Sequence, residues 1–140
     1  MSKSTLLRIH NVSVQYADST GAEHPIYSTA VPGGKIAWQL TTQSKSALIT
    51  AVDKSLVSSG GLVLYGDSTS TAHAQAMSES MDINPHDWTN GYLIGVDTMF
   101  FTIDDTGTIS SGTVDVSVVL ECTLETATQA SSTALALSQQ

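Results

Sequence analysis

Residues 113–125 read Thr-Val-Asp-Val-Ser-Val-Val-Leu-Glu-Cys-Thr-Leu-Glu, and this stretch decides the fold. Apolar side chains occupy every second position from Val114 to Leu124, and most of the residues between them are polar or acidic. Because successive side chains of a β-strand point to opposite faces, the alternation predicts a long strand with one face in a core and the other in water. Cys122 shares the apolar phase, so we expect it to be a small core residue.

Residues 5–16 show the same period but change phase once. Leu7 and Ile9 share one phase, and the apolar residues from Val12 to Tyr16 share the other. A change of phase inside one strand requires a bulge or a bend, which we place near His10-Asn11. Further strands are predicted at 36–40, 62–65 and 92–103, with turns at 18–21, 31–34 and 104–107.

Two other segments have helical spacing. In residues 44–57 the apolar side chains recur with the period of a helix face, and the hydroxyl and glycine residues at 42–44 and 58–61 are typical of helix ends. Residues 71–81 show a weaker pattern of the same kind. After residue 125 the chain is small and polar, so we expect one β-rich domain over 1–125 and a flexible polar tail over 126–140.

The composition is poor in charge and rich in hydroxyl groups. Charged residues make up 13% of the 140 positions, about half the usual ~25%, and there are 20 Ser and 18 Thr. The net charge is −8; residues 1–54 sum to +2 and residues 55–140 to −10. The asymmetry indicates either a solvated acidic surface or a positive end of one subunit that meets a negative end of the next.

Several classes of partner are disfavoured by the same residues. The chain has no basic arm or face, so we expect no direct binding of nucleic acid through a basic arm. It has no apolar run long enough for a membrane span and no visible signal peptide, so we expect folding in a reducing cytosol. The single cysteine excludes an internal disulfide.

No pattern predicts an enzyme, a cofactor or a metal site. His73, Glu79, Asp82 and His86 lie close in sequence, but no pair has the four-residue spacing of a helical zinc site. Asp104 and Asp105, with the hydroxyl of Thr106, are a candidate calcium site, although Asp-Asp-Thr-Gly is also ordinary turn chemistry. Trp38 and Trp88 are candidates for stacking on a sugar, against the more common core and interface roles.

Two stretches carry a resemblance to a known family. Residues 60–67, Gly-Gly-Leu-Val-Leu-Tyr-Gly-Asp, resemble the strand before the second helix of small icosahedral virus coat proteins of the jelly-roll type. Residues 112–120, Gly-Thr-Val-Asp-Val-Ser-Val-Val-Leu, resemble the last strand of that barrel. The fold class we predict is mainly β with two short helices, as an antiparallel β-sandwich or a jelly-roll-like barrel, with an α+β sandwich of the phage tail-tube type as the alternative.

The resemblance implies a virion structural protein, a self-assembling capsid or coat subunit located in the virion and made in the host cytoplasm. Its expected partners are many copies of itself and other virion proteins. A phage tail-tube subunit is the alternative within this class. A carbohydrate-binding β-domain that uses Trp88 is the alternative outside it.

Overall fold

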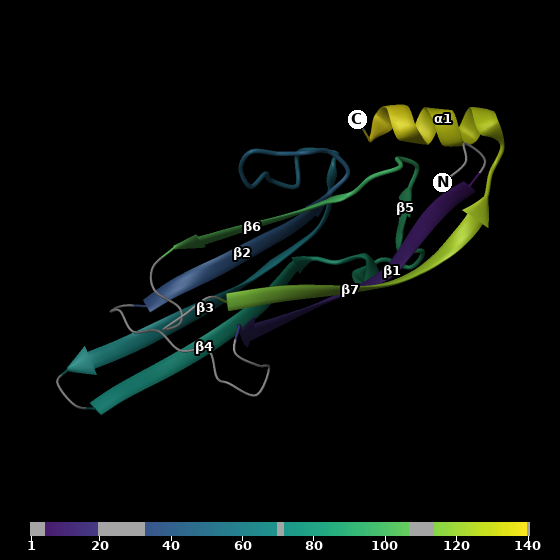
Figure 1. The fold of residues 1–140 in the computed structure, drawn as a ribbon. Coiled ribbons are helices and arrows are strands. Elements are labelled where there is room, and N and C mark those ends of the chain that lie inside the picture. The colour runs from purple at the N-terminus through teal and green to yellow at the C-terminus, as the bar shows by residue number, and fades with distance from the viewer. Residues whose placement is uncertain (1–4, 20–32, 70–71, 107–113, 140) are drawn as a thin grey trace.

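A computed structural model of the chain describes residues 5–19, 33–69, 72–106 and 114–139, and long strands dominate it (Figure 1). In chain order the elements are β1 (Thr5–Asp18), β2 (Gly33–Thr41), β3 (Leu56–Thr69), β4 (Ala72–Ile83), the 3-10 helix η1 (Pro85–Asp87), β5 (Tyr92–Ile94), β6 (Phe100–Thr106), β7 (Val114–Thr126) and α1 (Gln129–Ser138).

The strands form two antiparallel sheets that pack face to face. One sheet has the order β5-β1-β7 and the other the order β4-β3-β2-β6. Ile9 and Val12 of β1 share one buried cluster with Trp38 and Leu40 of β2 and Val57 of β3. The predicted antiparallel β-sandwich is therefore confirmed, while the strands in the described part of the chain close no barrel.

The phase change in β1 is a β-bulge, as predicted. The pairing of β1 with β7 is regular on both sides of a register shift between Ile9 and Asn11. The extra residue lets Ile9 and Val12 both face the core, although they lie an odd number of positions apart. Leu7 and Val14 continue the same face on either side of the bulge.

Strand β7 confirms the predicted alternation over its first half and departs from it in the second. From Val114 to Leu120 every second side chain is half-buried and packs against the core, and the residues between them are exposed. Cys122 is exposed and Leu124 is 68% exposed, so the prediction of a core cysteine is wrong. Figure 1 shows the reason, since the end of β7 runs past the four-stranded sheet toward α1.

Neither predicted helix exists. Residues 72–83 form β4, which pairs with β3 over most of its length, and the Ala residues at 72, 74 and 76 also fit a strand period. Residues 44–55 form a loop, and Leu56 and Val57 already belong to β3. Long-range pairing outweighs a weak helical spacing because propensity differences are under about 1 kcal/mol per residue.

The predicted strand over 92–103 is divided between the two sheets. Residues 92–94 form β5 beside β1, and residues 100–106 form β6 beside β2. Residues 104–106 belong to β6, so the turn predicted over 104–107 is wrong for these three residues, and Gly107 lies outside the described part of the chain. The loop between β5 and β6 thus carries the chain from one sheet to the other.

The segment predicted as a flexible tail contains α1, the one α-helix among the described residues. Helix α1 begins after Thr128, whose side-chain oxygen accepts a hydrogen bond from the backbone N–H of Ser131 at 3.2 Å. It lies beside the end of β5, where Gly95 is in close contact with Leu135 and Ala136 (Figure 1). The packing surface for this short polar helix comes from the sandwich, which explains why its own sequence does not predict it.

Trp38 is at the centre of the core. Its ring is fully buried, its Nε1 donates a hydrogen bond of 2.8 Å to the hydroxyl of Tyr16, and it stacks on Phe101 at 5.7 Å. Gly60 makes this possible, because a Cβ there would lie 2.8 Å from the Trp38 ring and 2.6 Å from the carbonyl oxygen of Ser80. Burial leaves Trp38 no face for a sugar.

The two faces of β7 predict different responses to one substitution. Val118→Asp places a carboxylate against the core and is expected to lower the free energy of unfolding by about 3 kcal/mol. Ser117→Asp changes only the exposed face and should cost less than about 1 kcal/mol. Urea unfolding of the two variants measures both. A larger loss for Ser117→Asp would mean that the faces are assigned the wrong way round.

Candidate functional site

Strand β7 is a long open edge of the three-stranded sheet. Its 13 residues pair with β1 on one side, and no strand among the described residues pairs with the other side. An unpaired strand presents a row of backbone N–H and C=O groups to which another strand can bind. We call this unpaired side of Val114–Thr126, together with the side chains of Val119 and Leu124, the β7 edge.

Exposed apolar surface lies on both faces of the β7 edge. Val119 is 67% exposed on the outer face of its sheet, and Leu124 is 68% exposed on the face that bears the core residues. The other sheet has different edges. Strand β6 exposes Ile103 beside Asp104 and Asp105, and β4 exposes Met77 near Glu79 and Asp82. Exposed charges of this kind discourage strand addition. Strand β7 also exposes two acids, Asp115 and Glu121, but none over residues 116–120.

Strand β1 holds the acidic side chains near the end of β7. The guanidinium of Arg8 forms an ion pair and a hydrogen bond with the carboxylate of Glu125. The side-chain amide of Asn11 donates a hydrogen bond of 2.7 Å to Glu121, and the ring of His10 shares one of 3.0 Å with Thr123. Two of the three acids of β7 therefore have partners inside the chain, and residues 116–120 carry no charge.

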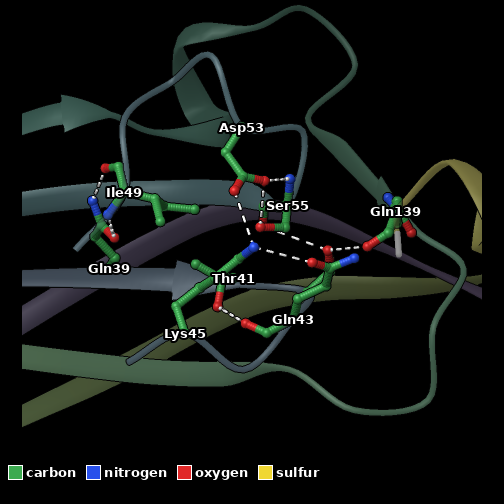
Figure 2. Close-up of polar contacts among 9 residues, drawn as sticks. Gln39, Thr41, Gln43, Lys45, Ile49, Asp53, Ser55 and Gln139 are labelled. Carbon is green, nitrogen blue, oxygen red and sulfur yellow. Dashed lines mark hydrogen bonds and ion pairs between the residues drawn. The ribbon is translucent and has the colours of Figure 1, made fainter. Parts of the chain in front are cut away.

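The loop between β2 and β3 carries a network of polar contacts (Figure 2). The side-chain amide of Gln39 accepts a hydrogen bond of 2.8 Å from the N–H of Ile49 and donates one to its carbonyl oxygen. The carboxylate of Asp53 forms an ion pair of 3.0 Å with Lys45 and accepts hydrogen bonds from the N–H and hydroxyl of Ser55. These contacts hold the loop in shape, so its polar groups are used within the chain.

These contacts lower the pKa of the Asp53 carboxyl from its ordinary 3.8 to about 2, with the hydrogen bond from the Ser55 backbone as the largest cause and Lys45 next. Because the pKa of the folded state lies below that of the unfolded state, the carboxylate stabilises the folded loop fully above about pH 4. That stabilisation is lost as the pH falls from about 4 toward 2.

We expect an NMR titration of Asp53 to give a midpoint near 2. Lys45→Met should raise the midpoint part of the way toward 3.8, because the donors of Ser55 remain. A midpoint of 3.8 in the unsubstituted chain would mean that the loop contacts do not form in solution.

Gln139 fastens the C-terminal helix to both sheets. Its side chain is buried, its Nε2 donates a hydrogen bond of 2.7 Å to the carbonyl oxygen of Leu93, and its Oε1 accepts one of 2.8 Å from the N–H of Gly95. Its backbone carbonyl accepts a hydrogen bond of 2.7 Å from the hydroxyl of Thr42. The side-chain amide of Gln139 thus binds the backbone of residues 93–95 through one donor and one acceptor, as the backbone of a neighbouring strand would.

Gln139→Ala is expected to loosen α1 by about 1–3 kcal/mol, because Gly95 N–H and Leu93 C=O lose their buried partner. Hydrogen exchange of the α1 amides should quicken in this variant. Leu137→Ala is the matched control, because Leu137 lies on the same helix and is 66% exposed. Equal exchange rates in the two variants would contradict the anchoring role of Gln139.

A cavity of about 290 Å³ lies between the β2–β3 loop and strands β2, β3 and β4. Gln39, Ile49, Ser59 and Asp82 are among its lining residues. No histidine, lysine or cysteine of the described residues lines it, so the Ser59 hydroxyl has no neighbour of the kind that activates a nucleophile. Every buried side-chain polar atom of the described residues already has a hydrogen-bond partner within the chain. None of them therefore points to a missing ligand.

Residues 73–86, which contain the four candidate metal ligands, are mostly an extended strand. His73, Glu79 and Asp82 lie on β4 and His86 lies in η1; the side chains of the two histidines are outside the described part of the structure. A strand rises about 20 Å from residue 73 to residue 79, so one ion does not reach both positions. The described residues contain no group of three metal-ligating side chains.

Asp104 and Asp105 are both exposed on β6. Successive side chains of a strand point to opposite faces, so these two carboxylates do not converge on one ion. The calcium site proposed for a turn at this position therefore lacks its geometry.

Trp88 remains a candidate for contact with a ligand. It is 50% exposed and lies 5.8 Å from the ring of Tyr92 in a tilted arrangement. The hydroxyl of Tyr92 donates a hydrogen bond of 3.3 Å to the carbonyl oxygen of Lys54, and this bond holds the Tyr92 ring in place beside Trp88.

Comparison of the chain with protein-family models, with curated proteins and with solved structures gives no match. The helices of the described segments include none with the length and apolar character needed to cross a membrane.

Sequence reasoning identified the strand β7 but missed the exposure of Leu124 and the anchoring roles of Gln39 and Gln139. A glutamine that pairs with backbone groups has no distinctive local pattern in the sequence. The surface that stands out in the structure is the β7 edge.

Proposed function

We propose that the chain is a structural subunit that assembles with copies of itself. The observation that carries this proposal is the β7 edge, one side of a long strand that is paired only on its other side, with no charge over residues 116–120 and exposed apolar side chains on both faces. Backbone pairing along such an edge supplies affinity without a deep pocket.

The composition of the surface supports the same proposal. The low charge content lowers the free energy needed to remove large areas of surface from water, because an ionised group costs far more to bury than a hydroxyl group that finds a hydrogen-bond partner. Interfaces between subunits are depleted in charge at their centres in the same way. Arg8 and Lys45 form ion pairs inside the chain, so attraction between oppositely charged ends is a smaller part of this proposal than strand pairing.

The particular kind of assembly that we propose is a virion coat, and the phage tail tube is the alternative. Support for a coat comes from the resemblance of residues 60–67 and 112–120 to jelly-roll coat proteins. The second stretch falls largely in the edge strand β7, whereas β3, which contains the first stretch, is followed by the strand β4 and not by a helix. A coat subunit of this kind is located in the virion, with other copies of the chain and other virion proteins as its partners.

A second candidate function is recognition of carbohydrate. It is favoured by the exposed ring of Trp88 beside Tyr92, since sugars stack on aromatic faces of this kind. Trp38 takes no part in this candidate because its ring is fully buried.

Assembly is tested with the purified full chain over a wide range of concentrations at physiological salt. We expect light scattering to detect species larger than the 14.7 kDa monomer, and electron microscopy to show regular shells or tubes. A species of 14.7 kDa at every concentration would overturn the proposal. A change in Trp88 fluorescence with added oligosaccharide in such a monomer, absent from Trp88→Ala, would favour the carbohydrate-binding candidate instead.

A further inference from the structure

We propose that β7 of one copy pairs antiparallel with β7 of a second copy around a twofold axis at Val119. This inference rests on the proposed function and names the interface through which assembly begins. The two β5-β1-β7 sheets would join into one continuous sheet. The argument for a second copy as the partner is that β7 is complementary to itself in this register.

The apolar face of β7 matches itself about Val119. A twofold axis perpendicular to the sheet places residues that are equally distant from position 119 opposite each other and keeps both inner faces on the same side. On the inner face, the facing pairs are Val114 with Leu124, Val116 with Cys122, and Val118 with Leu120. Every pair joins two apolar or weakly polar side chains, and Leu124, now 68% exposed, gains a neighbour.

The outer face matches itself as well. Val119, 67% exposed in the single chain, meets Val119 of the second copy. Ser117 faces Glu121 and Asp115 faces Thr123, so a hydroxyl that can donate a hydrogen bond stands opposite each carboxylate. Cross-strand pairs of this kind stabilise a sheet, whereas like charges directly opposite destabilise it.

Other positions of the twofold axis are less favourable, because they either oppose two carboxylates or shorten the paired segment. An axis at residue 118 opposes Asp115 to Glu121, and an axis at residue 120 opposes Asp115 to Glu125. An axis at residue 121 opposes Glu121 to itself. An axis at residue 117 pairs the described strand only over residues 114–120 and leaves Leu124 uncovered.

The internal partners of Glu121 and Glu125 contribute to the same selection. Asn11 holds Glu121, and Arg8 holds Glu125, so neither carboxylate requires a cation from the partner strand. A second copy, which offers no cation on β7, is therefore an acceptable partner.

The experiment is cysteine cross-linking in the full chain, with Cys122→Ser as the common background. Val119→Cys places the two thiols opposite each other across the axis, within the reach of a disulfide. Ser117→Cys is the matched control, because Ser117 is exposed on the same face of the same strand. In the proposed register the two residues 117 lie about 14 Å apart along the strands, too far for a disulfide.

Under mild oxidation we expect the Val119→Cys chain to convert to a linked dimer and the Ser117→Cys chain to remain unlinked on a non-reducing gel. Charge gives a second measurement that does not depend on disulfide geometry. Val119→Lys opposes two lysines and should abolish the dimer in sedimentation, whereas Ser117→Lys faces Glu121 and should retain it.

Equal cross-linking of the two cysteine variants, or equal oligomer distributions of the two lysine variants, would overturn this interface. If the unsubstituted chain still forms larger species in that case, the proposed assembly stands and uses another surface. A chain that is monomeric at every concentration would overturn the assembly and the interface together.

Discussion

The bulge between Ile9 and Asn11 is the constraint on which the sandwich depends. β1 is the central strand of its sheet, and its apolar residues belong to two different phases. Without the extra residue, either Leu7 and Ile9 or Val12 and Val14 would point to water, because a shift of one residue exchanges the two faces of a strand. With it, a single strand supplies core residues over its whole length, and β7 follows the same face by direct pairing.

Side-chain amides and hydroxyls complete the sandwich where its backbone ladders end. Gln139 pairs with the backbone beside β5, and Gln39 pairs with Ile49 in the loop after β2. Asn84, which is buried, donates a hydrogen bond of 3.0 Å to the carbonyl oxygen of Val12 and so joins the chain after β4 to β1. The abundance of polar uncharged residues is thus partly structural, since buried backbone groups need partners that charge-poor side chains provide at low desolvation cost.

The low charge content also leaves residues 116–120 of the β7 edge without the charged side chains that commonly protect an edge strand. Proteins commonly protect an edge strand with lysines, prolines or a covering element, and the described part of β7 has none of these. Its acids are Asp115, Glu121 and Glu125, which leave residues 116–120 uncharged, and the last two are held by β1. A strand built in this way is suited to binding another strand, which connects the fold to the proposed assembly.

The sequence by itself determined the elements whose signal is local and repeated. The alternation from Val114 to Leu120 and the phase change in β1 were sufficient to predict two strands, their faces and the bulge. The reason is that side chains two residues apart lie on the same face of a strand, so the pattern of apolar residues identifies the buried face directly. Tertiary structure decided the rest. Residues 72–83 are a strand because β3 offers a long pairing edge, and α1 is a helix because Gln139 and its neighbours dock on the sandwich. The exposure of Cys122 and Leu124 depends on how far the opposite sheet extends, and no local pattern contains that length.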